Sequence, residues 1–215
     1  MEIINAAINN LTEKNLLLYL TDSQLESIAV QNGWAGEIKN YYGDYLMVVD
    51  ANLAALKTDA VMNRSLNYKV SEVAGGLVAK LTLHYAHNGR PDWKTSAYKS
   101  YTRIYVPLGS QLIKISGYEL KQIDIGSEAG KTWFGFYLEV QPGKIKTLII
   151  DYKLPELAAT PKNYELYLQK QPGKEIGDGL VDLSFLNDIK SYSPTSLATQ
   201  KVSPGRLKWE GDLNI

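Results

Sequence analysis

The sequence predicts an α+β protein that is mainly β: an immunoglobulin-like antiparallel β-sandwich preceded by a small α/β segment. From residue 65 onward, apolar and polar residues alternate with a period of two, and turn signals recur at intervals of roughly 8–12 residues, which is typical of sandwiches and barrels. Before that point, helical spacing alternates with short apolar runs. We therefore expect two units: residues 1–64, the truncated tail of an upstream α/β domain, and residues 65–215, the sandwich.

The first forty residues predict two helices around a short strand. Ile3, Ile4, Ala7, Ile8 and Leu11 recur at helical spacing, which predicts a helix over residues 2–12. The apolar run at residues 15–20 predicts a buried strand. Thr21 and Gln24 have the spacing of a capping box, so a second helix is expected over residues 22–32. It should end at Asn32-Gly33, where glycine can supply a left-handed residue.

The run from Tyr41 to Leu53 predicts a central strand. Its residues are apolar on both sides, which indicates a strand buried on both faces. We expect the helices at 2–12 and 22–32 to cover at least one of these faces. Residues 54–64 have no strand pattern and are interpreted as a helical turn or linker.

The second unit contains eight or nine predicted strands joined by turns. Ala74-Gly75-Gly76 indicates a hairpin turn, and Gln141-Pro142-Gly143 between two β-prone runs predicts a second hairpin. A loop is expected at 191–199. The predicted strands cover residues 65–70, 77–85, 101–106, 111–116, 131–140, 144–154, 164–169, 180–186 and 206–213, and residues 118–125 are a candidate for one further short strand.

Composition excludes several function classes. Lys and Arg together number 23, as do Asp and Glu, so the chain lacks the basic excess of a nucleic-acid binder or of a segment drawn to anionic membranes. Cysteine is absent, which excludes disulfides, thiolate metal sites and cysteine nucleophiles. No apolar run approaches the roughly 20 residues of a membrane span. No nucleophile motif or phosphate-binding loop is present, so we expect no enzyme activity and no cofactor.

Basic and aromatic residues interleave just before and within the strand at 101–106, and they are the best candidates for a binding surface. Such a surface can stack on sugars or pair with anionic polymers. The alternative is a solvated loop whose aromatic residues anchor the strands. The candidates are Trp93, Lys94, Tyr98, Lys99, Tyr101 and Arg103.

A metal site has only weak candidates. Asp50, Asn52 and Asp59 could converge oxygen atoms on a calcium ion, but Asp and Asn in such positions more often bond their own backbone in turns. His84 and His87 are the only histidines; three residues apart on a strand, they should point to opposite faces and share no metal.

Several segments of the chain share the motifs of a known family. They are Gly33-Trp34-Ala35-Gly36, residues 43–53, Lys57-Thr58-Asp59, His87-Asn88-Gly89, residues 105–110, residues 131–135, Pro142-Gly143 with Lys146-Thr147-Leu148, residues 169–173 and residues 209–213. Taken in order, these segments resemble the C-terminal half of a bacterial extracytoplasmic family catalogued as domain of unknown function four thousand and twelve. The chain departs from the family at Ala54-Ala55-Leu56, where relatives often have two glycines, and in the compact loop after Asn88-Gly89.

The resemblance implies a protein at the cell surface, held by an N-terminal membrane anchor that this chain lacks. It transfers no activity and no catalytic residues. Two hypotheses follow. In the first, the chain is a non-catalytic structural or adhesive module of a membrane-anchored cell-envelope protein, with another envelope protein as partner. In the second, it binds cell-wall glycan or modifies cell-wall polymers, at the Trp93–Arg103 segment or where residues 1–64 meet the sandwich.

Overall fold

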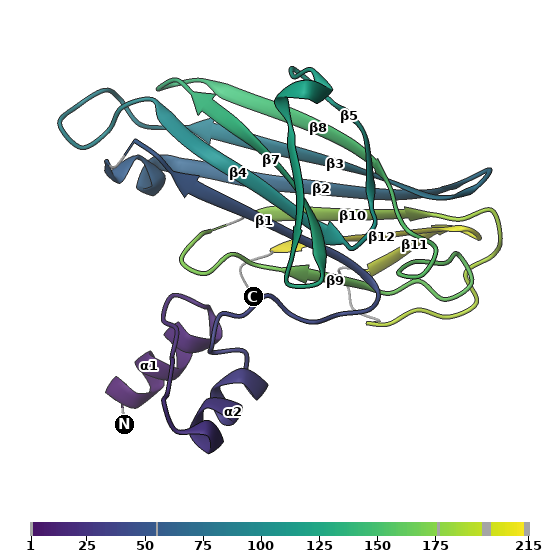
Figure 1. Ribbon diagram of the computed structural model, residues 1–215, viewed down its shortest axis with the longest axis horizontal. Helices are drawn as coiled ribbons and strands as arrows, with labels where there is room; N and C mark the ends of the chain where they lie inside the picture. Colours follow the sequence, from purple (N-terminus) through teal and green to yellow (C-terminus); the bar gives the residue numbers. More distant parts are fainter. Residues whose placement is uncertain (1, 55, 176, 195–198, 213–215) are drawn as a thin grey trace.

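The computed structural model describes residues 2–54, 56–175, 177–194 and 199–212 (Figure 1). In these ranges a β-sandwich carries two short helices at its N-terminal side, α1 (Glu2–Thr12) and α2 (Ser23–Gln31). Two 3-10 turns follow later, η1 (Lys57–Val61) and η2 (Leu120–Gln122). The predicted mainly-β α+β class is confirmed. No helix in the described ranges is long and apolar enough to cross a membrane.

The described strands form two layers. One sheet has five strands in the order β6-β7-β4-β1-β9, and the other has seven in the order β11-β12-β10-β2-β3-β8-β5. Both sheets are mixed rather than purely antiparallel, because β1 pairs in parallel with β9 and β2 with β10. The strands are β1 (Asp44–Asn52), β2 (Met62–Val73), β3 (Gly76–His87), β4 (Tyr98–Pro107), β5 (Gln111–Ile115), β6 (Asp124–Glu128), β7 (Lys131–Val140), β8 (Ile145–Lys153), β9 (Leu166–Gln169), β10 (Asp178–Ser184), β11 (Thr199–Ser203) and β12 (Arg206–Asp212).

The period-two pattern determines which side chains enter the core. Along β3, every second residue from Leu77 to Tyr85 is buried between the sheets, and the residues that alternate with them face outward. β2 and β3 pair along their whole length, which confirms the hairpin predicted at Ala74-Gly75-Gly76. The outward His84 and the buried His87 point to opposite faces, as their spacing indicated.

The second predicted hairpin is wrong. β7 pairs with β4 and β6 in the five-stranded sheet, whereas β8 pairs with β3 and β5 in the other. The turn at Pro142-Gly143 therefore carries the chain from one layer to the other. Gly143 has a left-handed φ of 70°, and its N–H donates to the carbonyl of His87 at 2.9 Å. A Pro-Gly turn specifies a chain reversal, but it does not specify which sheet receives the second strand.

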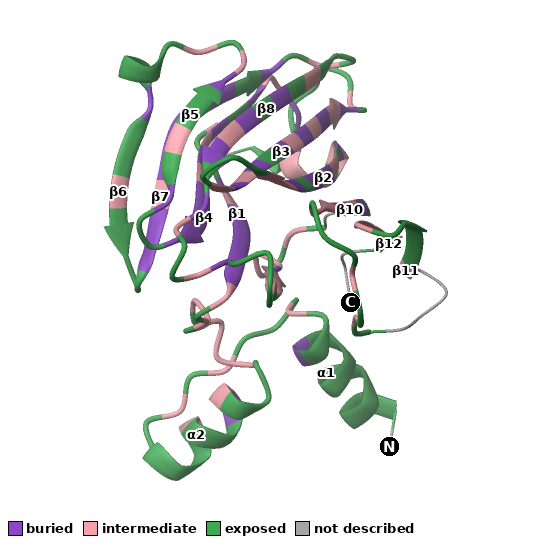
Figure 2. Cartoon of the chain, turned by 90° about the vertical axis from the view of Figure 1, so that its right-hand side faces the viewer, coloured by how far each residue is buried: buried purple, intermediate pink, exposed green. Residues whose placement is uncertain are grey.

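The strand expected at residues 41–53 is β1, and both of its faces are buried. The residues that cover these two faces of β1 differ from the prediction. Neither helix packs on it: both project away from the sheets and are mostly exposed (Figure 2). One face meets the opposite sheet, and the other lies under Ile38 and Tyr41. Because β1 pairs with β4 and β9, it belongs to the sandwich and not to an upstream segment, and the predicted boundary at residue 64 falls inside β2.

The N-terminal segment also differs in detail. Residues 15–20 form no strand, because no neighbouring strand offers a ladder; Leu18 N–H instead bonds the carbonyl of Trp34. The N-cap of α2 is Asp22 rather than Thr21, since the Asp22 carboxylate accepts from the N–H groups of Gln24 and Leu25 at 3.0 Å each. Three predictions extend outside the described residues: Leu213 at the end of the last strand, residues 195–198 of the loop at 191–199, and Ala55 of the linker.

Candidate functional site

The structure separates the six candidate binding residues. Tyr98 points into the sandwich, where the guanidinium of Arg64 donates to its hydroxyl at 3.0 Å. Trp93 is exposed in the loop before β4, and in the described structure its ring contact is with its neighbour Lys94, at 4.6 Å. The other three alternate with Tyr98 on β4 and face outward on the five-stranded sheet. These three are Lys99, Tyr101 and Arg103.

Two of these residues join a group that we call the aromatic platform: Tyr101, Arg103, Trp133 and Tyr137. The guanidinium carbon of Arg103 lies 4.4 Å from the centroid of the Trp133 ring and 5.6 Å from that of Tyr101. The rings of Tyr101 and Tyr137 meet edge to face at 5.0 Å. Tyr137 is 68% exposed, so the platform presents an aromatic surface to solvent.

Glycines on neighbouring strands give these rings room. A Cβ atom at Gly126 of β6 would collide with the Trp133 ring, and one at Gly135 of β7 would collide with the Tyr101 hydroxyl. Both rings can therefore lie against the sheet surface. Two acidic residues fix side chains of the aromatic platform. Asp124 accepts from the Tyr101 hydroxyl at 2.5 Å, and Glu128 pairs with Arg103 at 3.2 Å.

Asp50 and Asp59, two of the three weak metal-ligand candidates, lie around the guanidinium of Arg64. Arg64 donates to Asp50 at 3.0 Å and also to Asp59, which Lys174 pairs as well. Burial acts to raise the pKa of Asp59, but Lys174 and Arg64 outweigh it and lower that pKa overall. Asn52 bonds within its own turn, to Ala54 N–H and the Leu56 carbonyl. In the described ranges no three His, Asp or Glu side chains gather as metal ligands.

A second buried carboxylate, Asp44, has hydroxyl partners instead of a cation. Its Oδ2 accepts from Tyr68 at 2.7 Å and from Tyr164 at 2.5 Å, and its Oδ1 accepts from the N–H of Tyr45. Complete burial raises the pKa of Asp44 to about 6, although all three donors act to lower it. This group closes one end of the space described next, since Tyr164 lines that space.

A cleft opens between the two sheets where β9 faces β10 and β12. We call it the inter-sheet cleft. Its volume is about 1220 Å³. Leu46 and Leu66 lie at its floor and belong to the core. Its walls carry apolar side chains that remain only half-buried, because no side chain within the described ranges of the opposite sheet covers them fully. These are Leu166, Leu168, Leu183, Phe185, Leu207 and Trp209.

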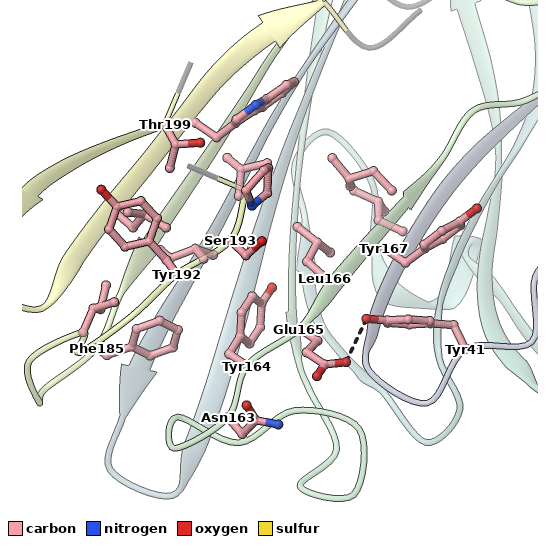
Figure 3. Close-up of a pocket in the computed structure, with 18 of the residues that line it drawn as sticks. Tyr41, Asn163, Tyr164, Glu165, Leu166, Tyr167, Phe185, Tyr192, Ser193 and Thr199 are labelled. Carbon is pink, nitrogen blue, oxygen red and sulfur yellow. Dashed lines mark hydrogen bonds between the residues drawn. The ribbon is translucent and has the colours of Figure 1, made fainter. Parts of the chain in front are cut away.

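Both walls of the cleft are visible in Figure 3. Tyr164 and Leu166 lie on one wall, and Phe185 and Tyr192 lie on the other. At the mouth, the hydroxyl of Tyr41 donates to the carboxylate of Glu165 at 3.1 Å. The lining thus combines an apolar interior with a polar rim, an arrangement suited to holding an apolar ligand in a fixed orientation.

Sequence reasoning missed the cleft. The alternation in residues 180–186 correctly indicated one apolar face for that strand, formed by Val181, Leu183 and Phe185. Nothing in that pattern tells whether another strand lies opposite the apolar face. Only part of the aromatic platform was predicted. Tyr101 and Arg103 of β4 were candidates, but Trp133 joins them through strand pairing that local sequence does not specify.

No protein-family model matches the chain, and no curated protein matches its sequence. Among solved structures, it is similar to a Legionella pneumophila protein named for nutrient binding, with a TM-score of 0.49, 10% identity, and coverage of 80% of this chain and 67% of that one. It is also similar to an M1 zinc metallopeptidase of Deinococcus radiodurans, with a TM-score of 0.31, 13% identity, and coverage of 71% and 39%.

A third similar structure is leukotriene A4 hydrolase of Saccharomyces cerevisiae, with a TM-score of 0.37 and 7% identity. Here 75% of this chain covers 29% of the hydrolase, so the chain spans well under half the length of either enzyme. Similarities of this size assign neither an activity nor a ligand to this chain.

Proposed function

We propose that the protein is a non-catalytic binding module whose ligand occupies the inter-sheet cleft. The observation that supports this proposal is the half-buried apolar lining, six large side chains contributed by both sheets. Apolar surface removed from water contributes about 25 cal/mol per Å². A ligand with apolar groups would therefore gain free energy by completing a core that the two sheets leave open.

A fluorescent apolar probe, 1-anilinonaphthalene-8-sulfonate, tests this proposal. We expect the native protein to bind it with enhanced emission, and Leu207→Asp in the cleft to weaken binding at least fivefold. Val202→Asp on β11 is the matched control, because Val202 is 50% exposed and does not line the cleft. Equal binding by the two variants, with circular dichroism confirming that both are folded, would refute a ligand site in the cleft.

We further propose that this module works as a structural or adhesive part of a membrane-anchored cell-envelope protein at the cell surface. The family resemblance of the sequence supports that setting, and another envelope protein would then be the partner. Surface biotinylation of cells that express the full-length gene product tests the location. Labelling equal to that of a cytoplasmic marker would contradict it.

Glycan binding is the second candidate function, and the aromatic platform favours it. Sugars stack their C–H faces on exposed aromatic rings, while charged side chains beside the rings bond the hydroxyls. A cell-wall glycan pull-down tests this function. We expect Trp133→Ala to reduce retention at least fivefold and Trp93→Ala, which alters an exposed ring off the platform, to leave it unchanged. Unchanged retention in Trp133→Ala would exclude the platform.

A further inference from the structure

The wall of the inter-sheet cleft includes a strand edge. β9 is the last described strand of the five-stranded sheet and pairs only with β1. Asp44 N–H donates to the carbonyl of Glu165 at 2.8 Å. Because backbone groups in a parallel ladder alternate between the two sides, Glu165, Tyr167 and Gln169 direct theirs toward β1. The N–H and C=O groups of Leu166 and Leu168 then point away from β1, toward the edge with which no strand in the described part of the chain pairs.

The two sheets end unequally on this side. The seven-stranded sheet continues past β10 with β12 and β11, whereas the five-stranded sheet stops at β9. β12 pairs with β10 so that Leu207 lies beside Leu183 and Trp209 beside Val181, with all four side chains lining the cleft. In the described part of the chain, no strand of the five-stranded sheet extends past β9 to cover Leu207 and Trp209.

The strand edge and the apolar wall of the cleft would each be satisfied by a different part of a ligand. The edge groups of Leu166 and Leu168 call for backbone hydrogen bonds, and the half-buried lining calls for apolar side chains at every second position. The volume of about 1220 Å³ exceeds the roughly 300–1,000 Å³ of ordinary small-molecule pockets. A fatty acid or a compact ligand would cover the apolar lining but would form no backbone hydrogen bonds with the edge of β9.

We propose that the occupant of the inter-sheet cleft is an extended peptide of alternating apolar and polar residues, which pairs with β9 as a sixth strand of the five-stranded sheet. Its apolar side chains cover Leu207 and Trp209, and its backbone satisfies the edge of β9. This inference rests on the proposed function and specifies its ligand class.

Peptide probes separate strand addition from simple apolar binding. The parent probe is a blocked octapeptide, Lys-(Val-Thr)₃-Lys, titrated by isothermal titration calorimetry. Two further probes carry N-methyl groups on the three valines or on the three threonines. In a strand, these two sets of N–H groups point in opposite directions, so only one set can face β9. We expect one methylated peptide to bind within twofold of the parent and the other at least tenfold more weakly.

The protein variants provide the second readout. Leu207→Asp should weaken binding of the parent peptide at least tenfold, and Val202→Asp should leave it within twofold. Equal binding of the two methylated peptides would overturn strand addition while leaving an apolar site in place. The same holds if the anilinonaphthalene probe binds in the cleft but no peptide does. Failure of every probe, including the anilinonaphthalene dye, would remove the proposed function itself.

Discussion

Asp44 and Asp50 show how one strand buries two carboxylates in different ways. Both lie on the inner face of β1, near its two ends, and both are less than 5% exposed. Asp50 has the guanidinium of Arg64 as well as hydroxyl donors from Tyr85 and Thr102. Asp44 has hydroxyl and backbone donors but no cation. A buried carboxylate without a countercharge favours its protonated form, so the stability that Asp44 contributes should depend on pH.

The stability of the protein should therefore fall as Asp44 ionises. Its folded pKa of about 6 lies above the ordinary value of 3.8, so its stabilising contribution is complete below about pH 4 and is lost as pH rises through 6. The difference of about 2 pKa units corresponds to on the order of 3 kcal/mol. We expect urea unfolding between pH 4 and 8 to show this loss in the native protein and not in Asp44→Asn. Parallel pH profiles for the two proteins would contradict the assignment.

Removing the cation from the other buried site should be costly. Arg64→Met leaves Asp50 buried without its ion pair, and broken buried pairs typically cost about 3–5 kcal/mol. Lys121→Met is the matched control, because Lys121 pairs with Glu119 at the surface, where both side chains are more than 60% exposed, and its loss should change stability little. Chemical denaturation of both variants measures the contrast, and equal losses would show that the Arg64 network is not a buried ion-pair site.

At the scale of elements, β6 and β7 shape the aromatic platform through their glycines. A methyl group at Gly126 would meet the Trp133 ring, so Gly126→Ala should displace the ring and destabilise the protein by about 1–3 kcal/mol. Gly177→Ala serves as the control, because a Cβ there meets nothing closer than 3.4 Å. Denaturation midpoints and tryptophan emission spectra test this prediction. An unshifted emission maximum in Gly126→Ala would mean that Trp133 does not lie over β6.

The strands and turns were largely predictable from the sequence, but the pairing partner of each strand was not. Alternation along β3 correctly gave its inward set, because period two is a local property of the chain. The turn at Pro142-Gly143 was equally visible, but the sheet that receives β8 depends on pairing with β3, whose paired residues lie 59 to 75 positions earlier. The same limit applies to the sites: Arg103 was a candidate, whereas Trp133, Asp44 with Tyr164, and the cleft all depend on contacts across strands.

At the scale of the whole molecule, Ile38 and Tyr41 pack on β1, but the helical segment before them is joined to the sandwich mainly through backbone and amide contacts. Gln169 accepts from Lys39 N–H and donates to the Glu37 carbonyl, and Gly173 N–H donates to the Lys14 carbonyl. The two helices bury only Leu11 and Ala29. Large side chains of this segment remain in solvent: Ile3 and Tyr19 are each more than 80% exposed. With so little apolar burial, this segment should open independently of the sandwich.

Native-state hydrogen exchange measures that independence. We expect the amides of α1 and α2 to exchange at least a hundredfold faster than those of β2 and β3, because opening the helices leaves the core between the sheets intact. Low concentrations of urea should leave the helix rates nearly unchanged while they accelerate exchange in β2 and β3, since local opening exposes little surface. The interior strand β4 provides an internal control and should follow β2 and β3. Equal protection of helices and strands would mean that the N-terminal segment unfolds only with the sandwich, and that its few polar contacts with residues 169–173 couple the two parts more strongly than their small buried area implies.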